Sequence, residues 1–266
     1  MRARERGNKI LKIINKTQAQ LTSNKNGDEL MGLLEVEVLA FDVFGTVVDW
    51  HGSLCREVDK LGLGVEAAEF VRAWRSGYEP AMQRVRSGEL GWTKIDVLHR
   101  LILDDIVADF GVVLTEEELV DLNLAWHRLD PWPDTVSGLN RLKPAYKLCT
   151  LSNGNLSLLS DMARHASLPW DLILSAEVFR AYKPDKEAYL GVADTFDIDP
   201  SKVMLVAAHQ YDLDAARQCG LKTAYIERPS EFGPDQIKDV SSNPHNNIHA
   251  RDFNDLADQL VSGKNK

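Results

Sequence analysis

The sequence predicts an α/β fold in which a parallel sheet is interrupted, after its first strand, by a block of helices. An isolated and strongly apolar segment at 36–42 predicts a buried strand, and four segments with helical periodicity follow it. From residue 135 onward, predicted strands and helices alternate. This alternation is typical of parallel sheets whose strands are joined by right-handed helical crossovers.

Length and composition place the chain among globular proteins. It has 266 residues, of which 44% are hydrophobic and 27% charged, and its net charge is −9. The acidic balance argues against nucleic acid as a partner, and no apolar run approaches the roughly 20 residues of a membrane span. Cys55, Cys149 and Cys219 are odd in number and widely spaced, which favours a reducing, cytoplasmic location over a disulfide framework.

The N-terminal segment differs from the rest of the chain. The first thirty residues carry seven Lys or Arg and three Asp or Glu, which leaves a charge of −13 for residues 31–266. We expect residues 1–34 to form a disordered extension outside the fold. A targeting peptide is the alternative, although the segment lacks the apolar region of a secretion signal.

The pattern predicts that a block of helices is inserted after the first strand of the sheet. Helical periodicity covers the segments 56–63, 65–82, 92–110 and 116–128. Thr115 and Glu118 form a capping box at the start of the last of them. The Pro- and Asp-rich stretch 130–134 then ends the helical pattern. We therefore expect a helical cap domain at 51–133 and a core domain made of 35–50 and 134–266.

The core elements follow in order after this break. Helices are predicted at 135–142, 156–165, 185–196, 211–219 and 252–261, and strands at 147–151, 172–175, 203–207 and 223–226. Pro184 lies near the start of one helix, and Gly220 follows the end of another. The expected architecture is a Rossmann-like parallel sheet core with helices on both faces, an inserted helical-bundle cap, and a cleft between them.

Polar side chains follow four of the predicted strands or stand before the next helix. They are Asp42 with Thr46, Ser152 with Asn153, Lys183, and His209 with Asp212. Each of these groups alone also suits a turn, a solvated loop or a helix start. Because the carboxyl ends of parallel strands meet at one edge of a sheet, their order predicts a common site.

Two other patterns are weaker. Residues 62–67 imitate a dinucleotide-binding fingerprint, but a helix rather than a strand precedes them. His245 and His249 are spaced as metal ligands on a helix could be, yet Asn, Pro and Asp surround them. We expect a loop there rather than a metal site.

Segments 41–46, 151–153, 182–184 and 206–212 resemble, in this order, the four motifs of the haloacid dehalogenase superfamily. The resemblance extends from about residue 36 to 233, including the position of the cap, and implies that Asp42 is the nucleophile. Most members are magnesium-dependent phosphatases that need a second acid two residues later, where this chain has Phe44. The fourth motif also lacks their adjacent acid pair. A halide leaves without protonation, so the departures favour carbon–halogen cleavage with no metal and no cofactor.

The cap carries a more specific resemblance. Segment 74–88 resembles the arginine region of type II 2-haloacid dehalogenases, which implies that Arg75 attracts the departing halide together with Asn153. Ser152 and Lys183 would hold the substrate carboxylate or orient Asp42. Tyr189 also matches a tyrosine of the family, although helix packing explains it too.

One departure from the family pattern concerns the fourth motif. Many type II members have Ser-Ser-Asn where this chain has 207–209, ending in His209. The variant resembles a branch in which some members accept fluorinated acids. Trp92 would line the halide pocket or belong to the core, and Phe44 and Tyr211 would exclude water from the substrate.

The resemblance implies hydrolytic dehalogenation of short-chain L-2-haloacids, with fluoroacetate among the candidates, to 2-hydroxyacids with inversion. An aspartyl ester on Asp42 would be the intermediate, and Thr46 and Lys183 would keep Asp42 ionised. Asp212, with His209 or Lys183, would position or deprotonate the hydrolytic water. The expected partners are the haloacid, the halide ion and a second subunit of a homodimer. A capped magnesium-dependent phosphatase and an inactive binding relative are the alternatives.

Overall fold

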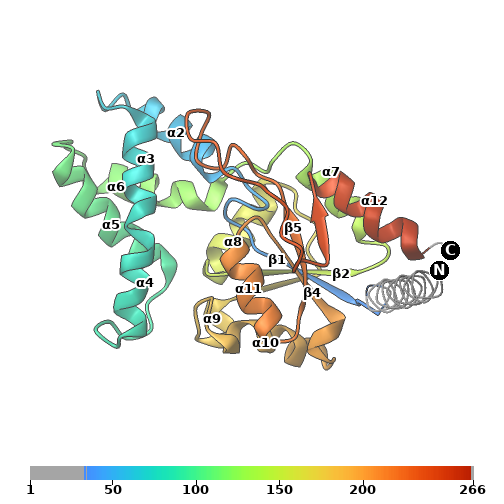
Figure 1. The fold of residues 1–266 in the computed structure, drawn as a ribbon. Helices are drawn as coiled ribbons and strands as arrows, with labels where there is room; N and C mark the ends of the chain where they lie inside the picture. The colour runs from blue at the N-terminus through green and yellow to red at the C-terminus, as the bar shows by residue number, and fades with distance from the viewer. Residues whose placement is uncertain (1–32, 34, 265–266) are drawn as a thin grey trace, which may run out of the picture.

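The computed structural model describes Leu33 and residues 35–264, so the expected extension at 1–34 lies, apart from Leu33, outside the described residues. Within them, six strands form a sheet in the order β3-β2-β1-β4-β5-β6, with every neighbouring pair parallel (Figure 1). The strands are β1 Val38–Phe41, β2 Lys147–Ser152, β3 Leu172–Ser175, β4 Val203–Ala207, β5 Lys222–Ile226 and β6 Ile248–Ala250.

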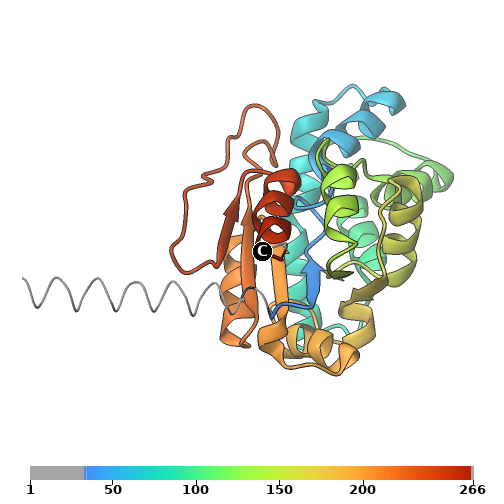
Figure 2. The same cartoon turned by 90° about the vertical axis from the view of Figure 1, so that its right-hand side faces the viewer.

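Helices cover both faces of the sheet (Figure 2). They are α7 Thr135–Leu142, α8 Leu156–His165, α9 Ala176–Phe179, α10 Lys186–Phe196, α11 Gln210–Gln218 and α12 Phe253–Lys264, with a short 3-10 helix η2 at Pro200–Lys202. Side chains alternate along a strand, so Leu39 and Phe41 of β1 join the apolar cluster under α7, α8 and α12. Val38 and Ala40 join the second cluster, under α10 and α11. The predicted α/β fold with a parallel sheet is confirmed.

The inserted helices lie to one side of the sheet, beyond the carboxyl end of β1 (Figure 1). They are α2 Trp50–Leu61, α3 Ala67–Ser76, α4 Tyr78–Arg86, α5 Ile95–Asp109 and α6 Glu116–Asn123, followed by the 3-10 helix η1 Leu124–Arg128. Buried aromatic rings hold them together, with Trp74 and Trp126 in edge contact at 5.5 Å. The insert returns to the core where Val48 forms a bridge with Pro131.

The helical insert differs from the expectation in several places. The helix predicted over 116–128 is α6 followed by η1, and the helix predicted over 92–110 is α5 at Ile95–Asp109. The helix predicted over 65–82 is two helices, α3 and α4, because the chain turns at Gly77. A Cβ at Gly77 would lie 2.5 Å from the Ile102 side chain, so glycine allows the close approach of α5. The turn also places Pro80 in the first turn of α4, where its missing N–H costs no helical hydrogen bond. The helix predicted from Arg56 starts at Trp50 instead, since the Asp49 side chain accepts the Gly52 N–H.

The sheet has one strand more than expected. The segment of His245 and His249, expected to be a loop, contains β6, and the Nε2 atom of His249 lies 2.7 Å from Glu227. The strand spans three residues, too few to show a period of two. In residues 33 and 35–264, no group of three or more His, Cys, Asp or Glu side chains is arranged to hold a metal ion. None of the described helices is both long and apolar enough to cross a bilayer.

The order of the strands creates the crevice in which the site lies. β1 and β4 are neighbours in the sheet, yet β2 and β3 lie on one side of β1 and β5 and β6 on the other side of β4. The connections that leave β1 and β4 therefore diverge, and a crevice opens beyond their carboxyl ends. Asp42 and His209 are located there, directly after these two strands.

Candidate active site

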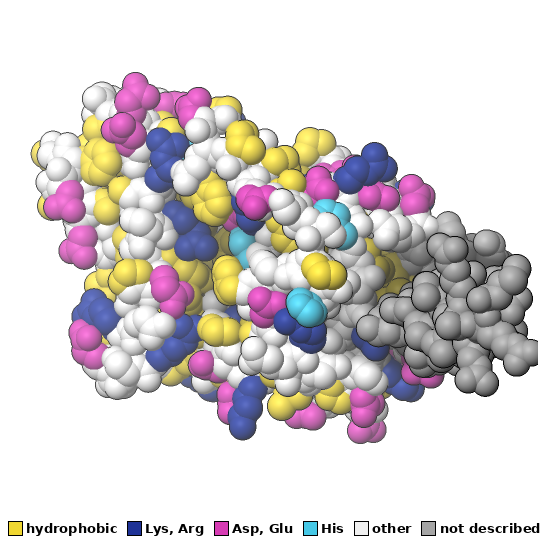
Figure 3. Space-filling model, viewed as in Figure 1, with side chains coloured by type: hydrophobic (Ala, Val, Ile, Leu, Met, Phe, Trp, Pro, Cys, Tyr) yellow, Lys and Arg dark blue, Asp and Glu magenta, His cyan; other side chains and the backbone are white. Residues whose placement is uncertain are grey.

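A cavity of about 380 Å³ lies between the cap and the carboxyl edge of the sheet. The core contributes Asp42, Phe44, Asn153, Lys183, Pro184, His209 and Tyr211 to its wall, and the cap contributes Arg75, Tyr78, Glu79 and Met82. In the space-filling view, dark blue and cyan side chains lie along the hollow between cap and core (Figure 3). Seven of the twelve residues predicted for the site therefore share one cavity.

Asp42 is held by three side chains. Its backbone N–H continues the ladder by bonding the Val206 carbonyl at 3.0 Å. The Thr46 hydroxyl donates to Oδ2 at 2.6 Å, and Lys183 Nζ donates to Oδ1 at 2.8 Å. His209 Nδ1 lies 3.0 Å from Oδ2. Burial alone would raise the pKa of Asp42, but the charges of Lys183 and His209 outweigh it and hold the pKa well below its usual range.

Lys183 joins Asp42 to a second buried acid. Its Nζ atom lies 2.5 Å from Oδ2 of Asp212, and the Tyr189 hydroxyl donates to Oδ1 of Asp212 at 2.6 Å. Burial and then the charge of Asp42 raise the pKa of Asp212, which the bonds from Lys183 and Tyr189 partly offset. The two carboxylates raise the pKa of Lys183 against the effect of burial, so the ammonium stays charged between them.

His209 lies between two carboxylates. Its Nδ1 atom faces Asp42, and its Nε2 atom lies 2.7 Å from Oε1 of Glu231. Burial would lower the pKa of His209, but Glu231 and Asp42 outweigh that effect and raise it to about 9. The ring is therefore an imidazolium at neutral pH.

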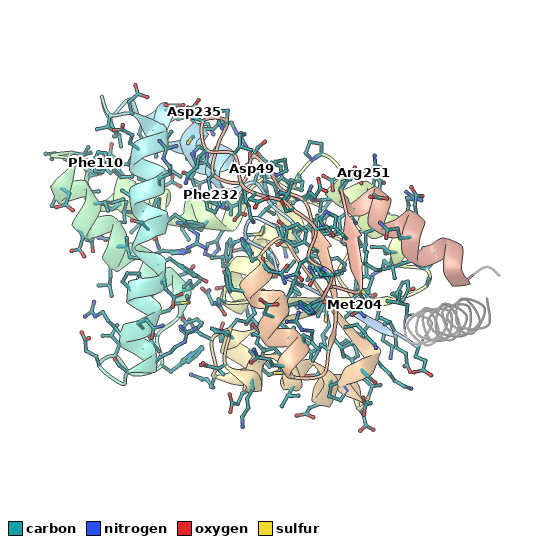
Figure 4. All side chains as sticks on the ribbon, viewed as in Figure 1. Asp49, Phe110, Met204, Phe232, Asp235 and Arg251 are labelled. Carbon is teal, nitrogen blue, oxygen red and sulfur yellow. The ribbon has the colours of Figure 1, made fainter. Side chains whose placement is uncertain are left out.

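Glu231 is a buried residue of the site that sequence reasoning missed. Its carboxylate also accepts from Lys238 Nζ at 2.5 Å. Burial would raise the pKa of Glu231, but the charges of His209 and Lys238 hold it at about 2. Glu231 and Lys238 lie on the loop after β5, which passes from the sheet toward α2, where Phe232 and Asp235 are labelled in Figure 4. Glu231 lies five residues beyond the end of β5, so the rule that polar groups gather at strand ends does not reach it.

Arg75 brings a cation from the cap to the cavity. Its guanidinium lies 4.3 Å from the ring centre of Tyr78 and 5.9 Å from that of Trp50. Within the part of the chain that the structure describes, it forms no ion pair with a carboxylate, so its charge is free for an anion.

Asn153 and Ser152 shape the loops around the cavity. The Asn153 side-chain oxygen accepts the backbone N–H of Lys183 at 2.8 Å, which ties the two loops together. The Asn153 amide nitrogen lies 3.4 Å from the Met82 sulfur of the cap. Ser152 is fully buried, and its hydroxyl oxygen accepts the Gly154 N–H at 3.1 Å. Ser152 thus contacts its own turn rather than Asp42.

Several predicted residues lie outside the cavity wall. Thr46 and Asp212 lie behind the wall, where they bond Asp42 and Lys183 respectively. Tyr189, predicted to bind substrate, is buried against Asp212. Trp92 stacks on Tyr182 with ring centres 4.9 Å apart, which is the core placement that the sequence left open.

Phe44 lies in the cavity wall, two residues after Asp42. It packs edge-on against Trp126 of the cap at 5.7 Å and against His99 at 6.4 Å. His99 is buried, and burial lowers its pKa to about 3, so this wall is uncharged. The cavity therefore combines a charged floor at the sheet edge with an apolar wall beneath the cap.

Comparisons with known proteins agree with this geometry. A family model described as haloacid dehalogenase-like hydrolase matches residues 36–220. The (S)-2-haloacid dehalogenase 4A of Burkholderia cepacia is 30% identical over 218 residues, which cover 73% of this chain and 86% of that protein.

Solved structures give the same result. The crystal structure of an L-2-haloacid dehalogenase is 47% identical, with a TM-score of 0.81, over 85% of this chain and 99% of that one. A defluorinating L-2-haloacid dehalogenase is 43% identical, with a TM-score of 0.82, over 85% and 95% of the two chains. The chain thus belongs to the haloacid dehalogenase-like hydrolases and, within them, to the (S)-2-haloacid dehalogenase family.

Proposed function

We propose that this protein hydrolyses the carbon–halogen bond of short-chain L-2-haloacids and releases 2-hydroxyacids with inversion at C2. The observation that carries the proposal is the ionised carboxylate of Asp42, which lines the same cavity as the guanidinium of Arg75, a group without a carboxylate partner among the described residues. A buried anionic nucleophile and a free cation suit a substrate that loses a halide anion. The names of the similar proteins point to the same reaction.

In the first step, an oxygen of Asp42 attacks C2 from the side opposite the halogen and forms an ester. The carbon–halogen bond breaks, and the halide takes the electron pair. Arg75 and Asn153, both in the cavity wall, would receive it. Phe44 and Tyr211 line the cavity and would exclude water from the alkyl side.

In the second step, water attacks the carboxyl carbon of Asp42 rather than the substrate carbon. Asp212 shares the Lys183 ammonium with Asp42, and its raised pKa makes it the better proton acceptor of the two. It would take a proton from the water and return it to the leaving oxygen of the hydroxyacid. Tyr189 would hold Asp212 in place from behind.

Halide release from L-2-chloropropionate, D-2-chloropropionate and fluoroacetate, each with and without chelator, tests the function. We expect chelator-insensitive chloride release from the L enantiomer, and none from the Asp42→Asn variant. A strict magnesium requirement, or equal rates with both enantiomers, would contradict the proposal. Fluoroacetate is included because one relative of 43% identity is described as defluorinating.

The covalent step has its own test. In a single turnover in heavy-oxygen water, the label should appear in Asp42, and unlabelled oxygen should appear in the hydroxyacid. Label in the first-turnover product would instead indicate direct attack by water at C2. Proteolysis and mass spectrometry of the segment that contains Asp42 measure the incorporation.

Three further expectations remain part of the proposal. The division into a cap at 51–133 and a core made of 35–50 and 134–266 would let substrate bind between two bodies. A homodimer is expected, which light scattering after size-exclusion chromatography would test. A cytoplasmic location is expected, which fractionation of the source cells would test.

A further inference from the structure

Six charged side chains at the site form a row in which acids and bases alternate. In order they are Asp212, Lys183, Asp42, His209, Glu231 and Lys238. Successive contacts measure 2.5, 2.8, 3.0, 2.7 and 2.5 Å. The proposed reaction uses the first three, and it gives no role to His209, Glu231 or Lys238.

The contacts of His209 determine its protonation. An ionised carboxylate can only accept hydrogen bonds, and both ring nitrogens of His209 face carboxylates. Both nitrogens must therefore carry a proton. Glu231 is 1% exposed and is itself held by Lys238 and, at 3.5 Å, by the indole N–H of Trp50. It is a fixed acceptor for the outer face of the ring.

The fit of Glu231 against the nucleophile loop is close. Gly45, three residues after Asp42, has a φ of +82°, and a Cβ there would lie 2.3 Å from Oε1 of Glu231. Any larger side chain at Gly45 would displace the carboxylate that bonds His209. The loop that carries the nucleophile and the loop that carries Glu231 are thus shaped to each other.

Two donors converge on one oxygen of Asp42. The Thr46 oxygen accepts the backbone N–H of Ala208 at 2.9 Å, so its own proton is directed to Oδ2 of Asp42. The Nδ1–H of His209 is directed to the same Oδ2 atom, while Oδ1 faces Lys183. A pair of fixed donors aimed at one carboxyl oxygen is the arrangement that stabilises an oxyanion in acyl transfer.

On the basis of the proposed function, we infer that Thr46 and His209 form an oxyanion hole for hydrolysis of the aspartyl ester, and that Glu231 is the positioning residue that keeps His209 charged and aimed.

The bonds change in the following order. Oδ1 of Asp42 forms the bond to C2, and Oδ2 becomes the ester carbonyl oxygen. When water adds to the carboxyl carbon, the carbonyl electron pair moves to Oδ2. One water proton goes to Asp212. On collapse, the bond between the carboxyl carbon and Oδ1 breaks, Oδ1 leaves with the hydroxyacid and takes the proton from Asp212. The restored carboxyl group of Asp42 releases the remaining water proton to solvent.

The groups around His209 define what a change at Glu231 would alter. Asp42 and Glu231 face the ring nitrogens, and the Tyr211 ring lies 5.6 Å from the His209 ring. Lys183 and Lys238 face the two carboxylates from the far sides. Without the charge of Glu231, Asp42 is the one carboxylate that remains to face His209, while Lys183 and Lys238 lie on either side. While the ester exists, the carboxyl group of Asp42 is neutral as well. We expect His209 to lose its proton in that state.

The Glu231→Gln variant tests this inference, with Glu227→Gln as a matched control. Glu227 lies in the same loop and bonds Nε2 of His249 at 2.7 Å, the same kind of pair as Glu231 with His209, but away from the cavity. We expect Glu231→Gln to lower kcat for L-2-chloropropionate at least about 10-fold, since loss of a whole oxyanion donor typically costs about 100- to 1,000-fold. kcat/KM, which reports ester formation, should change by less than about 3-fold.

Rapid quenching gives a readout that a merely structural role would not move. With carbon-14-labelled L-2-chloropropionate, Glu231→Gln should release a burst of about one halide per active site, and the carbon label should accumulate as an ester on Asp42. Glu227→Gln should behave as the parent enzyme does. If kcat and kcat/KM fall together without a burst, or if both variants behave alike, the inference is overturned while the proposed function stands.

The protonation of His209 is measured without any variant at Glu231. Nitrogen-15 spectra of the histidines, with the His209 signals assigned by their loss in His209→Gln, should show both ring nitrogens protonated at pH 7.5. A neutral ring in the parent protein would overturn the inference even if Glu231→Gln fails to fold. Absence of halide release from every haloacid by the parent protein would overturn both the function and the inference.

Discussion

Replacing Lys183 by methionine removes the cation between Asp42 and Asp212 and keeps a side chain of similar length. A charge pair at 2.8 Å attracts by about 6 kcal/mol at an effective dielectric constant of about 20. Desolvation of the ammonium offsets part of this, and removing one partner of a buried pair costs about 3–5 kcal/mol. The loss of stability in the variant is limited, because Asp42 or Asp212 can take up a proton instead of remaining charged. For an unperturbed pKa near 3.9, this protonation costs about 4 kcal/mol at pH 7 but only about 1.5 kcal/mol at pH 5.

The sign of the pH dependence follows from these pKa shifts. In the parent protein the pKa of Asp42 is held low, so the stabilisation is present throughout the range above its unfolded value. In Lys183→Met the folded pKa of one carboxyl group rises, so the penalty is largest at high pH and declines as that group protonates. We expect the free energy of unfolding to fall by about 3–4 kcal/mol at pH 7 and by about 1–2 kcal/mol at pH 5.

Urea unfolding of both proteins at pH 7 and pH 5, followed by tryptophan fluorescence, measures the difference. Lys143→Met is the matched control, because Lys143 pairs with Asp171 at 2.6 Å while the two side chains remain 37% and 39% exposed. Its loss should cost less than about 1 kcal/mol and should vary little between the two pH values. An equal loss at both pH values for Lys183→Met, or a loss no larger than that of the control, would refute the reasoning.

Asp42→Asn should lower kcat for halide release more than about 1,000-fold, measured by ion chromatography, and residual turnover near the parent rate would rule out the ester. Arg75→Met should lower kcat/KM about 100-fold without moving the urea midpoint, because its guanidinium contacts rings rather than carboxylates; a lowered midpoint would indicate a structural role. Tyr189→Phe removes a hydrogen-bond donor to the Asp212 carboxylate and should lower kcat about 10-fold. An unchanged kcat would contradict the role of Asp212 in the second step. The pKa of His209 is raised from 6.5 to about 9, so its contribution to stability is complete below pH 6.5 and is lost as pH rises through about 9. Urea midpoints between pH 6 and 10 should show this decline in the parent protein and not in His209→Gln.

The helices and strands of the core were predicted well, because clear sequence signals mark where each of them begins and ends. The helices at 135–142 and 156–165 and the strands at 172–175 and 203–207 match the structure residue for residue. The turn at Gly77 was missed because its cause, the close approach of Ile102, is a contact between helices that periodicity does not encode. The short strand that contains His249 was missed for the same kind of reason, since pairing with β5 creates it.

The site was predictable where polar residues stand next to recognisable strand ends. Asp42, Asn153 and His209 follow this rule, whereas Lys183 stands just before α10, and all four line the cavity. Glu231 lies 189 residues after Asp42, on an irregular loop without periodicity. Its role follows only from the packing of that loop against Gly45 and His209. Distances between loops are a property of the folded chain, and no pattern in the sequence records them.

The loop after β5 has a mechanical consequence for the cap. Trp50, the first residue of α2, donates to Glu231 and packs against Phe232 at 5.9 Å, so the start of α2 is fastened to the loop after β5. At the other end, α4 meets the core through Arg86, which bonds the Lys183 carbonyl and lies 3.7 Å from Asp185. A cap that swings about the start of α2 to admit substrate would therefore break the Arg86 contacts, together with those of Lys94 with Glu177 and of Asp96 with Asn155. Such a motion would open the cavity beside Lys183 while the Glu231 end stays closed.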